Sequence, residues 1–186
     1  MLIVILGPDG SGKTSLAKLL ANNNDNLTYI YFGNNIESRN YTYFKSFLQR
    51  DKKGFFFTFF KYIFIFINDF NYYYLAKKKN MIADRCPVDK ILGAKLKKDK
   101  LRFIYQKFSQ ALMRSPDYVI LLHGDAKVIY DRTKEISEEK IEYYIKFYRN
   151  HIAKYKIPFI EIDTTLNDLE SSFQIANSNI QKILEK

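Results

Sequence analysis

A glycine-rich octapeptide near the start of the chain leaves few folds open. Gly7–Thr14, which reads GPDGSGKT, fits the pattern G-x-x-x-x-G-K-[ST] and stands between an apolar run and a stretch of helical character. In that context, glycines let successive backbone N–H groups turn toward one anion, and the start of the following helix adds partial positive charge. The pattern therefore predicts a loop that binds the phosphates of a nucleotide. The residues expected to contact that nucleotide are Gly7, Asp9, Gly10, Ser11, Gly12, Lys13, Thr14 and Ser15.

The rest of the chain alternates short, β-branched apolar runs with longer stretches whose apolar residues recur every three or four positions; Ile141, Ile145, Tyr148 and Ile152 form one such stripe. Strands that are apolar throughout and separated by helices predict a parallel sheet covered on both faces. We expect residues 1–186 to form a single three-layer α/β/α P-loop NTPase domain with a five-stranded parallel sheet. The expected strands are Leu2–Leu6, Thr28–Phe32, Met81–Ala83, Tyr118–Leu122 and Phe159–Ile162. The expected helical stretches are Lys13–Asn23, Tyr41–Arg50, Phe55–Lys77, Lys100–Arg114, Ala126–Thr133, Ser137–Tyr155 and Leu166–Leu184.

A second candidate site follows the strand at Met81–Ala83, where Asp84 is followed at once by Arg85. In an open parallel sheet, ligands bind beyond the carboxyl ends of the strands, so Asp84 is expected beside the glycine-rich loop. There the carboxylate could orient Mg²⁺ together with the Thr14 hydroxyl, and Arg85 could bridge anionic oxygens in a bidentate manner. A structural ion pair at a strand end is the alternative.

Composition excludes several classes of site. A single cysteine, Cys86, excludes an internal disulfide and a zinc site built from several thiolates, and it fits a reducing compartment. We therefore expect a cytoplasmic protein. Only two histidines, His123 and His151, are present, which argues against a histidine-rich metal site.

The net charge of +10 comes mostly from lysine. Lysine clusters at Lys52–Lys53, Lys77–Lys79 and Lys95–Lys100 are typical of solvated faces, and the alternative is a field that attracts phosphorylated substrates. The chain carries no nucleic-acid-binding motif, so we expect a small-molecule phosphate acceptor as its partner and no nucleic acid.

One segment, Phe55–Phe70 (FFFTFFKYIFIFINDF), raises the question of a membrane helix. A spanning helix needs about 20 apolar residues, and Lys61, Asn68 and Asp69 interrupt this one. We predict no transmembrane segment here and expect a buried or interfacial helix.

Four segments resemble the thymidylate kinase family: GPDGSGKTSL at Gly7–Leu16, the tripeptide Ala83–Arg85, the strand with its Pro-Asp start at Pro116–Leu122, and Arg132–Glu135 before a helix. The agreement is closest to its divergent thymidylate kinase-like branch, some members of which lie among cell-surface polysaccharide genes. The resemblance covers nearly the whole chain in order. It implies a nucleoside monophosphate kinase fold, ATP as phosphate donor, a lid over the phosphates and, as is frequent in the family, a homodimer.

The resemblance also implies roles for single residues. Lys13, Asp84, Arg85 and Arg132 would be catalytic, with the metal held by Asp84 and Thr14. In these assignments, cations of the loop, the third strand and the lid would neutralise most of the negative charge on the transferred phosphoryl group.

Two loop positions bear on the lid. Asp9 stands where an acidic residue often contacts a sugar hydroxyl of the acceptor, and Gly10 stands where some members carry an arginine. An enzyme without that arginine would take its positive charge from the lid, at about 132–140. Arg132 and Lys134 are the candidates there, with Lys140 further on, and ordinary solvated charges at a helix end are the alternative.

The acceptor side departs from the family. Members usually follow the acid–arginine pair with an aromatic residue and later a serine, where this chain has Cys86 and Asp89. Asp89 could bind an acceptor hydroxyl or support a neighbouring site residue, and capping of a helix start is the alternative. We treat Cys86 as a packed thiol.

Other acceptor residues are assigned by distance along the chain. The family places a base-stacking phenylalanine and a phosphate-binding arginine on the helix before the third strand, and the matches are Phe59 or Phe60 and Lys61. The two phenylalanines are favoured as core residues over stacking platforms, because aromatic side chains of such a helix must be buried somewhere. Arg39 lies where the phosphate of the acceptor would be held.

The sequence therefore favours an ATP- and Mg²⁺-dependent phosphotransferase that acts on dTMP or a related nucleoside monophosphate. A kinase of the same fold acting on a sugar or surface-polysaccharide precursor is one alternative. The other is a non-catalytic nucleotide-binding module, although the chain has no N-K-x-D sequence for reading guanine.

Overall fold

The structure is a computed structural model, which describes residues 1–32, 80–96 and 115–184 together with separate helical positions within 56–74 and 104–108. The predicted helical stretch 41–50 and most of 55–77 and 100–114 lie outside the described residues. The candidate acceptor residues Arg39 and Lys61 also lie outside them.

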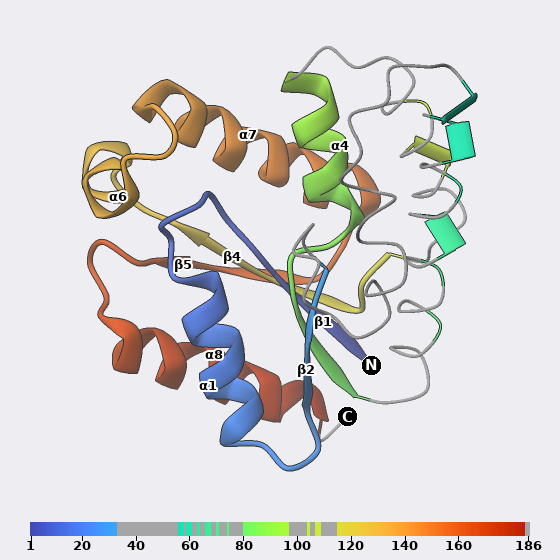
Figure 1. The fold of residues 1–186 in the computed structure, drawn as a ribbon. Helices are drawn as coiled ribbons and strands as arrows, with labels where there is room; N and C mark the ends of the chain where they lie inside the picture. Colours follow the sequence, from blue (N-terminus) through green and yellow to red (C-terminus); the bar gives the residue numbers. More distant parts are fainter. Residues whose placement is uncertain are drawn as a thin grey trace.

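Five parallel strands form one sheet in the order β2-β3-β1-β4-β5 (Figure 1). The central strand β1 is buried along its whole length, because helices cover both of its faces. The predicted five-stranded parallel sheet is confirmed, and each strand start matches its predicted residue. The strands are β1 Leu2–Leu6, β2 Thr28–Tyr31, β3 Met81–Asp84, β4 Tyr118–His123 and β5 Phe159–Asp163.

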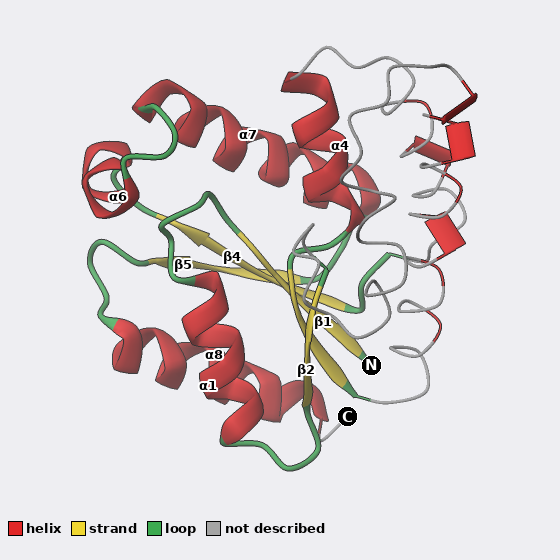
Figure 2. Ribbon diagram, in the orientation of Figure 1, coloured by secondary structure: helices red, strands yellow, loops and turns green. Residues whose placement is uncertain are grey.

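Helices cover the sheet in two outer layers, as predicted (Figure 2). Helices α1 and α8 cover one face, packing on Ile3, Ile5 and Ile120, whereas α4 and α7 cover the other and pack on Val4 and Leu121. Helix α6 packs against α7 through a small cluster of its own. The helices are α1 Lys13–Asn22, α4 Pro87–Leu96, α6 Ala126–Thr133, α7 Glu138–Tyr155 and α8 Leu169–Leu184.

Helix α4 is the element that the apolar periodicity did not predict. Among the described side chains of this ten-residue helix, the buried apolar ones are Val88, Ile91 and Leu92, so its stripe is too short to stand out. Its start is marked instead by Pro87 at the first helical position and by Asp89 in the first turn. Capping of a helix start was considered for Asp89 only as the alternative to a role in the site, and no helix was predicted over 87–96.

The start of α8 also differs from the prediction. The chain turns at 164–168 before the helix begins, because Asp163 Oδ1 accepts hydrogen bonds from the backbone N–H groups of Thr165 and Leu166. Asp168 then caps the helix through the backbone N–H of Ser171.

Two described residues of the aromatic segment, Phe59 and Phe60, are less buried than predicted. Phe59 and Phe60 are 53% and 51% exposed, so their interpretation as core residues is wrong. Nine of the 16 residues at Phe55–Phe70 are aromatic, and a helix can turn only one side toward the core. Within the described part of the chain, no helix combines the length and apolar character that crossing a bilayer requires.

Candidate active site

The glycine-rich loop joins β1 to α1 at the carboxyl edge of the sheet. Gly10 and Gly12 adopt positive φ angles of 91° and 82°, a backbone conformation that residues other than glycine rarely adopt. Gly12 occupies the N-cap position of α1 and supplies no side-chain cap, so the first backbone N–H groups of the helix stay open to an anion. The loop thus has the backbone form that a phosphate site needs.

Lys13 lies folded back over the loop. Its Nζ donates hydrogen bonds to the Pro8 carbonyl at 2.7 Å and to Asp9 Oδ1 at 3.4 Å. The side chain is buried, and that burial lowers the pKa of Lys13, although the Asp9 carboxylate opposes the shift. The ammonium group therefore sits in a partly dry site where an anion would interact with it strongly.

Asp84 ends β3 directly beside the loop, as expected for a residue at the carboxyl end of a parallel strand. It is fully buried, and its Oδ2 accepts a hydrogen bond from the Thr14 hydroxyl. Among the described residues, no group donates a hydrogen bond to its Oδ1. A buried carboxylate oxygen without a partner, next to a hydroxyl, is the donor set that Mg²⁺ takes from proteins when phosphates and waters complete its shell.

No cluster of three or more His, Cys, Asp or Glu side chains able to hold a metal is found in the described part of the chain.

Arg85 follows Asp84 and turns toward the same loop. Its Nη2 donates a hydrogen bond to Asp9 Oδ1 at 2.5 Å. Burial opposes the charge of Arg85, but the carboxylates of Asp9 and Asp89 outweigh it and raise its pKa. Asp9 thus contacts both predicted cations of the site, Lys13 and Arg85.

Both carboxylate oxygens of Asp89 accept hydrogen bonds from the protein. Its Oδ2 accepts the backbone N–H of Cys86 at 2.8 Å, and its Oδ1 accepts the Tyr148 hydroxyl at 2.7 Å. The first bond caps α4, which is the alternative considered for this residue. The second bond joins Asp89 to α7, and no feature of the sequence predicted it.

Two further tyrosines lie close enough to this cluster to interact electrostatically with it. Burial raises the pKa of both Tyr31 and Tyr144; Asp9 and Asp89 raise each further and Arg85 opposes the shift. Tyr31 ends β2 and Tyr144 stands one turn before Tyr148 on α7. Sequence reasoning missed both, because a tyrosine on an apolar stripe is indistinguishable from a core residue.

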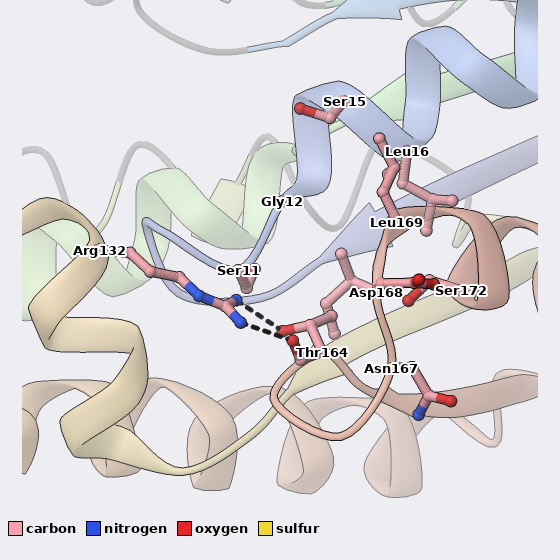
Figure 3. Close-up of a pocket in the computed structure, with 11 residues that line it drawn as sticks. Ser11, Gly12, Ser15, Leu16, Arg132, Thr164, Asn167, Asp168, Leu169 and Ser172 are labelled. Carbon is pink, nitrogen blue, oxygen red and sulfur yellow. Dashed lines mark hydrogen bonds between the residues drawn. The ribbon is translucent and has the colours of Figure 1, made fainter.

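The three candidate lid cations differ in their surroundings. Arg132, near the end of α6, donates hydrogen bonds to the Thr164 carbonyl at 2.7 Å and to the Thr164 hydroxyl at 3.4 Å (Figure 3). Lys134 and Lys140 are exposed, and Lys134 ends α6 in the left-handed conformation. Of the three candidate lid cations, Arg132 is the one that lines a pocket in the described part of the chain.

That pocket has a volume of about 220 Å³ and lies between the glycine-rich loop, α6 and the turn from β5 into α8 (Figure 3). Two of its hydroxyl groups, on Ser11 and Ser172, are buried and have no hydrogen-bond partner within the described regions. The residues that line it are Ser11, Gly12, Ser15, Leu16, Leu122, Arg132, Thr164, Asn167, Asp168, Leu169 and Ser172.

The part of this pocket that belongs to Thr164–Ser172 was not predicted from the sequence. The position of Thr164 could have indicated it, because Thr164 directly follows β5, whose carboxyl end lies at the same edge of the sheet as the loop. Reading every strand end, rather than only those of β1 and β3, would have found it.

Many solved structures share this fold, including the three that follow. Deoxyadenosine kinase from M. mycoides with dCMP and dCDP bound matches with a TM-score of 0.65 at 22% identity, covering 98% of this chain and 100% of its own. The YorR protein from Bacillus subtilis in complex with phosphorylated GDP matches with a TM-score of 0.62 at 19% identity, covering 100% and 96%. Thymidylate kinase from Candida albicans matches with a TM-score of 0.66 at 15% identity, covering 99% and 90%. At these identities the likeness shows the fold.

In sequence, no curated protein matches the chain. The model of the thymidylate kinase family, in contrast, matches residues 5–175, which include the glycine-rich loop, Asp84 with Arg85, and the β5–α8 turn. With its P-loop and its matching fold, the chain is a P-loop kinase that belongs to the thymidylate kinase family.

Proposed function

We propose that the protein is an ATP- and Mg²⁺-dependent kinase that transfers the γ-phosphoryl group of ATP to dTMP or a related nucleoside monophosphate. The observation that carries this proposal is the convergence of Lys13, Asp84 and Arg85 on one loop, with Asp9 contacting both cations. Family membership supports the nucleotide as acceptor.

The donor's base and sugar would occupy the pocket beside the loop. A volume of about 220 Å³ is below the roughly 300–1,000 Å³ of pockets that hold a whole ligand, which suits a nucleoside whose phosphates extend onto the loop. Arg132 borders this pocket, so its guanidinium would contact the donor on the nucleoside side.

Mg²⁺, when bound, would neutralise phosphate charge and hold two oxygens in place. Thr14 and Asp84 would hold it, since the Asp84 Oδ1 atom is buried and lacks a hydrogen-bond partner in the described regions. Asp84 also fixes the Thr14 hydroxyl at the start of α1.

The protein's contribution to the transfer would be positioning and charge. An acceptor phosphate oxygen attacks the γ-phosphorus while the bond from that phosphorus to the bridging oxygen of ATP breaks, so ADP leaves. Negative charge spreads over the equatorial oxygens, where Lys13 and Arg85 would stabilise it. A bound phosphate would compete with Asp9 for both cations, which leaves the Asp9 carboxylate available to an acceptor hydroxyl.

The test measures ADP release from Mg·ATP against a panel of ribo- and deoxynucleoside monophosphates, with a no-acceptor control. Deoxynucleosides belong in the panel, because one kinase of the same fold is a deoxyadenosine kinase. Sugars are included because a sugar precursor is the alternative acceptor. Strong stimulation by one monophosphate supports the proposal. Stimulation only by nucleosides or sugars keeps the phosphotransferase and refutes the acceptor, and slow hydrolysis that no acceptor stimulates favours a non-catalytic module.

A matched pair of lysine variants ties the activity to the loop. Lys13→Ala should abolish transfer, because it removes the buried cation of the loop. Lys18→Ala, one turn further along α1 at an exposed position, should retain it. Equal activities in the two variants would exclude Lys13 from the site.

A further inference from the structure

The turn that carries Arg85 has an unusual backbone. Arg85 has a φ of 72°, and the other two described non-glycine residues with positive φ, Lys134 and Lys156, each follow the end of a helix. That conformation is common at helix ends but costs energy elsewhere. Arg85 instead follows a strand, so surrounding contacts must hold its backbone in place.

The backbone N–H of Arg85 donates to the Ile5 carbonyl at 3.3 Å, and the next contacts along the chain come from Asp89. Its carboxylate accepts the Cys86 N–H at 2.8 Å, and its own N–H donates to the Cys86 carbonyl at 3.0 Å. This reciprocal pair closes the turn directly after Arg85. The Asp89 carboxylate is also near enough to the Arg85 guanidinium to favour its charge.

The second oxygen of Asp89 depends on α7. The Tyr148 hydroxyl donates to it at 2.7 Å from a side chain that is 1% exposed. Tyr144 and Phe147 pack edge-on against the Tyr148 ring, with centroids 6.4 Å and 6.0 Å away. The hydroxyl is therefore held by a packed ring and has little freedom to move.

Burial is the largest influence on the Asp89 carboxyl, and it raises the pKa of Asp89. The Cys86 N–H, the Tyr148 hydroxyl, Arg85 and Lys13 all oppose this shift. Loss of the Tyr148 hydroxyl would leave one oxygen of a buried carboxyl without its donor, and such a group tends to rearrange.

We propose that Tyr148, acting through Asp89, is a positioning residue for Arg85. The chain of contacts runs from α7, which begins within the lid segment 132–140, through Asp89 to the turn at 85–86. The inference rests on the proposed function for the role of Arg85 in transfer. The contacts themselves do not depend on that role, so the two can be tested apart.

The first test uses Cys86 as a probe of the turn. It is the only cysteine of the chain and is buried, so iodoacetamide labels it when the turn opens. Tyr148→Phe should label about tenfold faster than wild type under native conditions, because a lost hydrogen bond to a charged group favours local opening by about that factor. Tyr155→Phe removes a hydroxyl from the exposed end of the same helix and should label at the wild-type rate.

A conservative variant separates positioning from charge. Asp89→Asn keeps an oxygen for the Cys86 N–H and gains an NH₂ group that can donate to the Tyr148 oxygen, so its labelling should stay near the wild-type rate. Asp89→Ala loses both contacts and should label at least as fast as Tyr148→Phe. Urea unfolding of each variant shows whether it is folded under the labelling conditions.

The second test is a double-mutant cycle on kcat. Tyr148→Phe should lower kcat about tenfold in the wild-type background and leave it unchanged in the Arg85→Ala background, because the hydroxyl acts through Arg85. Wild-type labelling and kcat for Tyr148→Phe would overturn the inference, as would the same loss of kcat in both backgrounds. A wild-type kcat for Arg85→Ala would instead refute the proposed role of Arg85, and the labelling rates would then decide whether the pair holds the turn.

Discussion

The guanidinium group of Arg85 and the carboxylate of Asp9 meet at 2.5 Å, although 76 positions separate them in the chain. The contact exists because β3 lies beside β1 in the sheet, so that the ends of these two strands reach the same edge. Asp9 Oδ1 also accepts a hydrogen bond from Lys13. One carboxylate oxygen thus serves both cations of the phosphate site.

This shared carboxylate predicts the effect of Asp9→Asn on ATP binding. Removing its charge leaves Lys13 and Arg85 without an anionic competitor, so the affinity for ATP should rise several-fold, measured by isothermal titration calorimetry. Transfer to the acceptor should fall, because the same carboxylate is proposed to meet the acceptor's hydroxyl. The exposed Asp25, on the turn after α1, gives the control Asp25→Asn, which should match wild type in both. Weaker ATP binding by Asp9→Asn would contradict the competition.

The glycines of the loop make a second prediction, on stability. A Cβ at Gly10 would lie 3.0 Å from the Ile129 carbonyl oxygen and 3.0 Å from Thr133 Cγ2, both on α6, whereas a Cβ at Gly12 would meet nothing within 4 Å. Both positions have positive φ, so an alanine at either carries a backbone penalty of about 1 kcal/mol. Gly10→Ala should be destabilised by a further 1–2 kcal/mol or so, because α6 must shift.

Urea unfolding of Gly10→Ala and Gly12→Ala checks this difference. Equal losses of free energy of unfolding would show that α6 adjusts freely to the loop. The same packing accounts for the absence of an arginine at position 10, since its first side-chain carbon would already press on the backbone of α6.

The sequence predicted the parts of this molecule that are local and periodic. The P-loop, the five strand starts and the acid–arginine pair follow from residue types at fixed spacing or from short apolar runs. The helix at Pro87–Leu96 was missed, because its stripe of buried residues is short and its start is set by one carboxylate. The local pattern therefore drew attention to Asp89 but did not reveal its hydrogen bonds with Cys86 and Tyr148.

Contacts between distant segments could not be predicted in the same way. The Asp89–Tyr148 hydrogen bond joins residues 59 positions apart, and the bond from Arg132 to Thr164 depends on how α6 leaves β4. Neither has a spacing that a sequence motif could record. The acceptor residues Arg39 and Lys61 stay predictions.

His151 predicts a pH dependence of stability. Burial, with Lys107 and Lys154 nearby, lowers its pKa from the ordinary 6.5 to about 4. Between these two pH values the unfolded chain binds a proton at His151 that the folded chain does not, so stability falls as the pH drops through this window and is fully present above it.

The measurement is urea unfolding of wild type and His151→Gln at about pH 7.5 and about pH 5. The wild type should lose more free energy of unfolding than the variant over this interval, because the variant has no imidazole to protonate. Parallel losses in the two proteins would show that His151 is accessible to protons in the folded state.

Two neighbouring asparagines at the end of α1 allow a test of the contacts that join this helix to α8. Asn24 is 8% exposed; its Nδ2 donates to the Leu20 carbonyl and to Asn177 Oδ1, and its Oδ1 accepts from Gln181. Asn177 and Gln181 belong to α8, so this side chain joins the two helices on one face of the sheet. Asn23, the C-cap of α1, is exposed, and its Nδ2 donates to the Leu19 carbonyl of that helix.

Asn24→Ala should therefore lower the free energy of unfolding by about 2 kcal/mol, because it removes the three hydrogen bonds of a buried side chain, two of them to α8. Asn23→Ala should lower it by about 0.5 kcal/mol or less, as is usual for an exposed position. Chemical denaturation of both variants measures the difference. Because α1 begins at the P-loop and α8 begins at the pocket beside it, Asn24→Ala should also weaken ATP binding. An unchanged ATP affinity in a destabilised Asn24→Ala protein would show that the far ends of the two helices do not affect the geometry of the site.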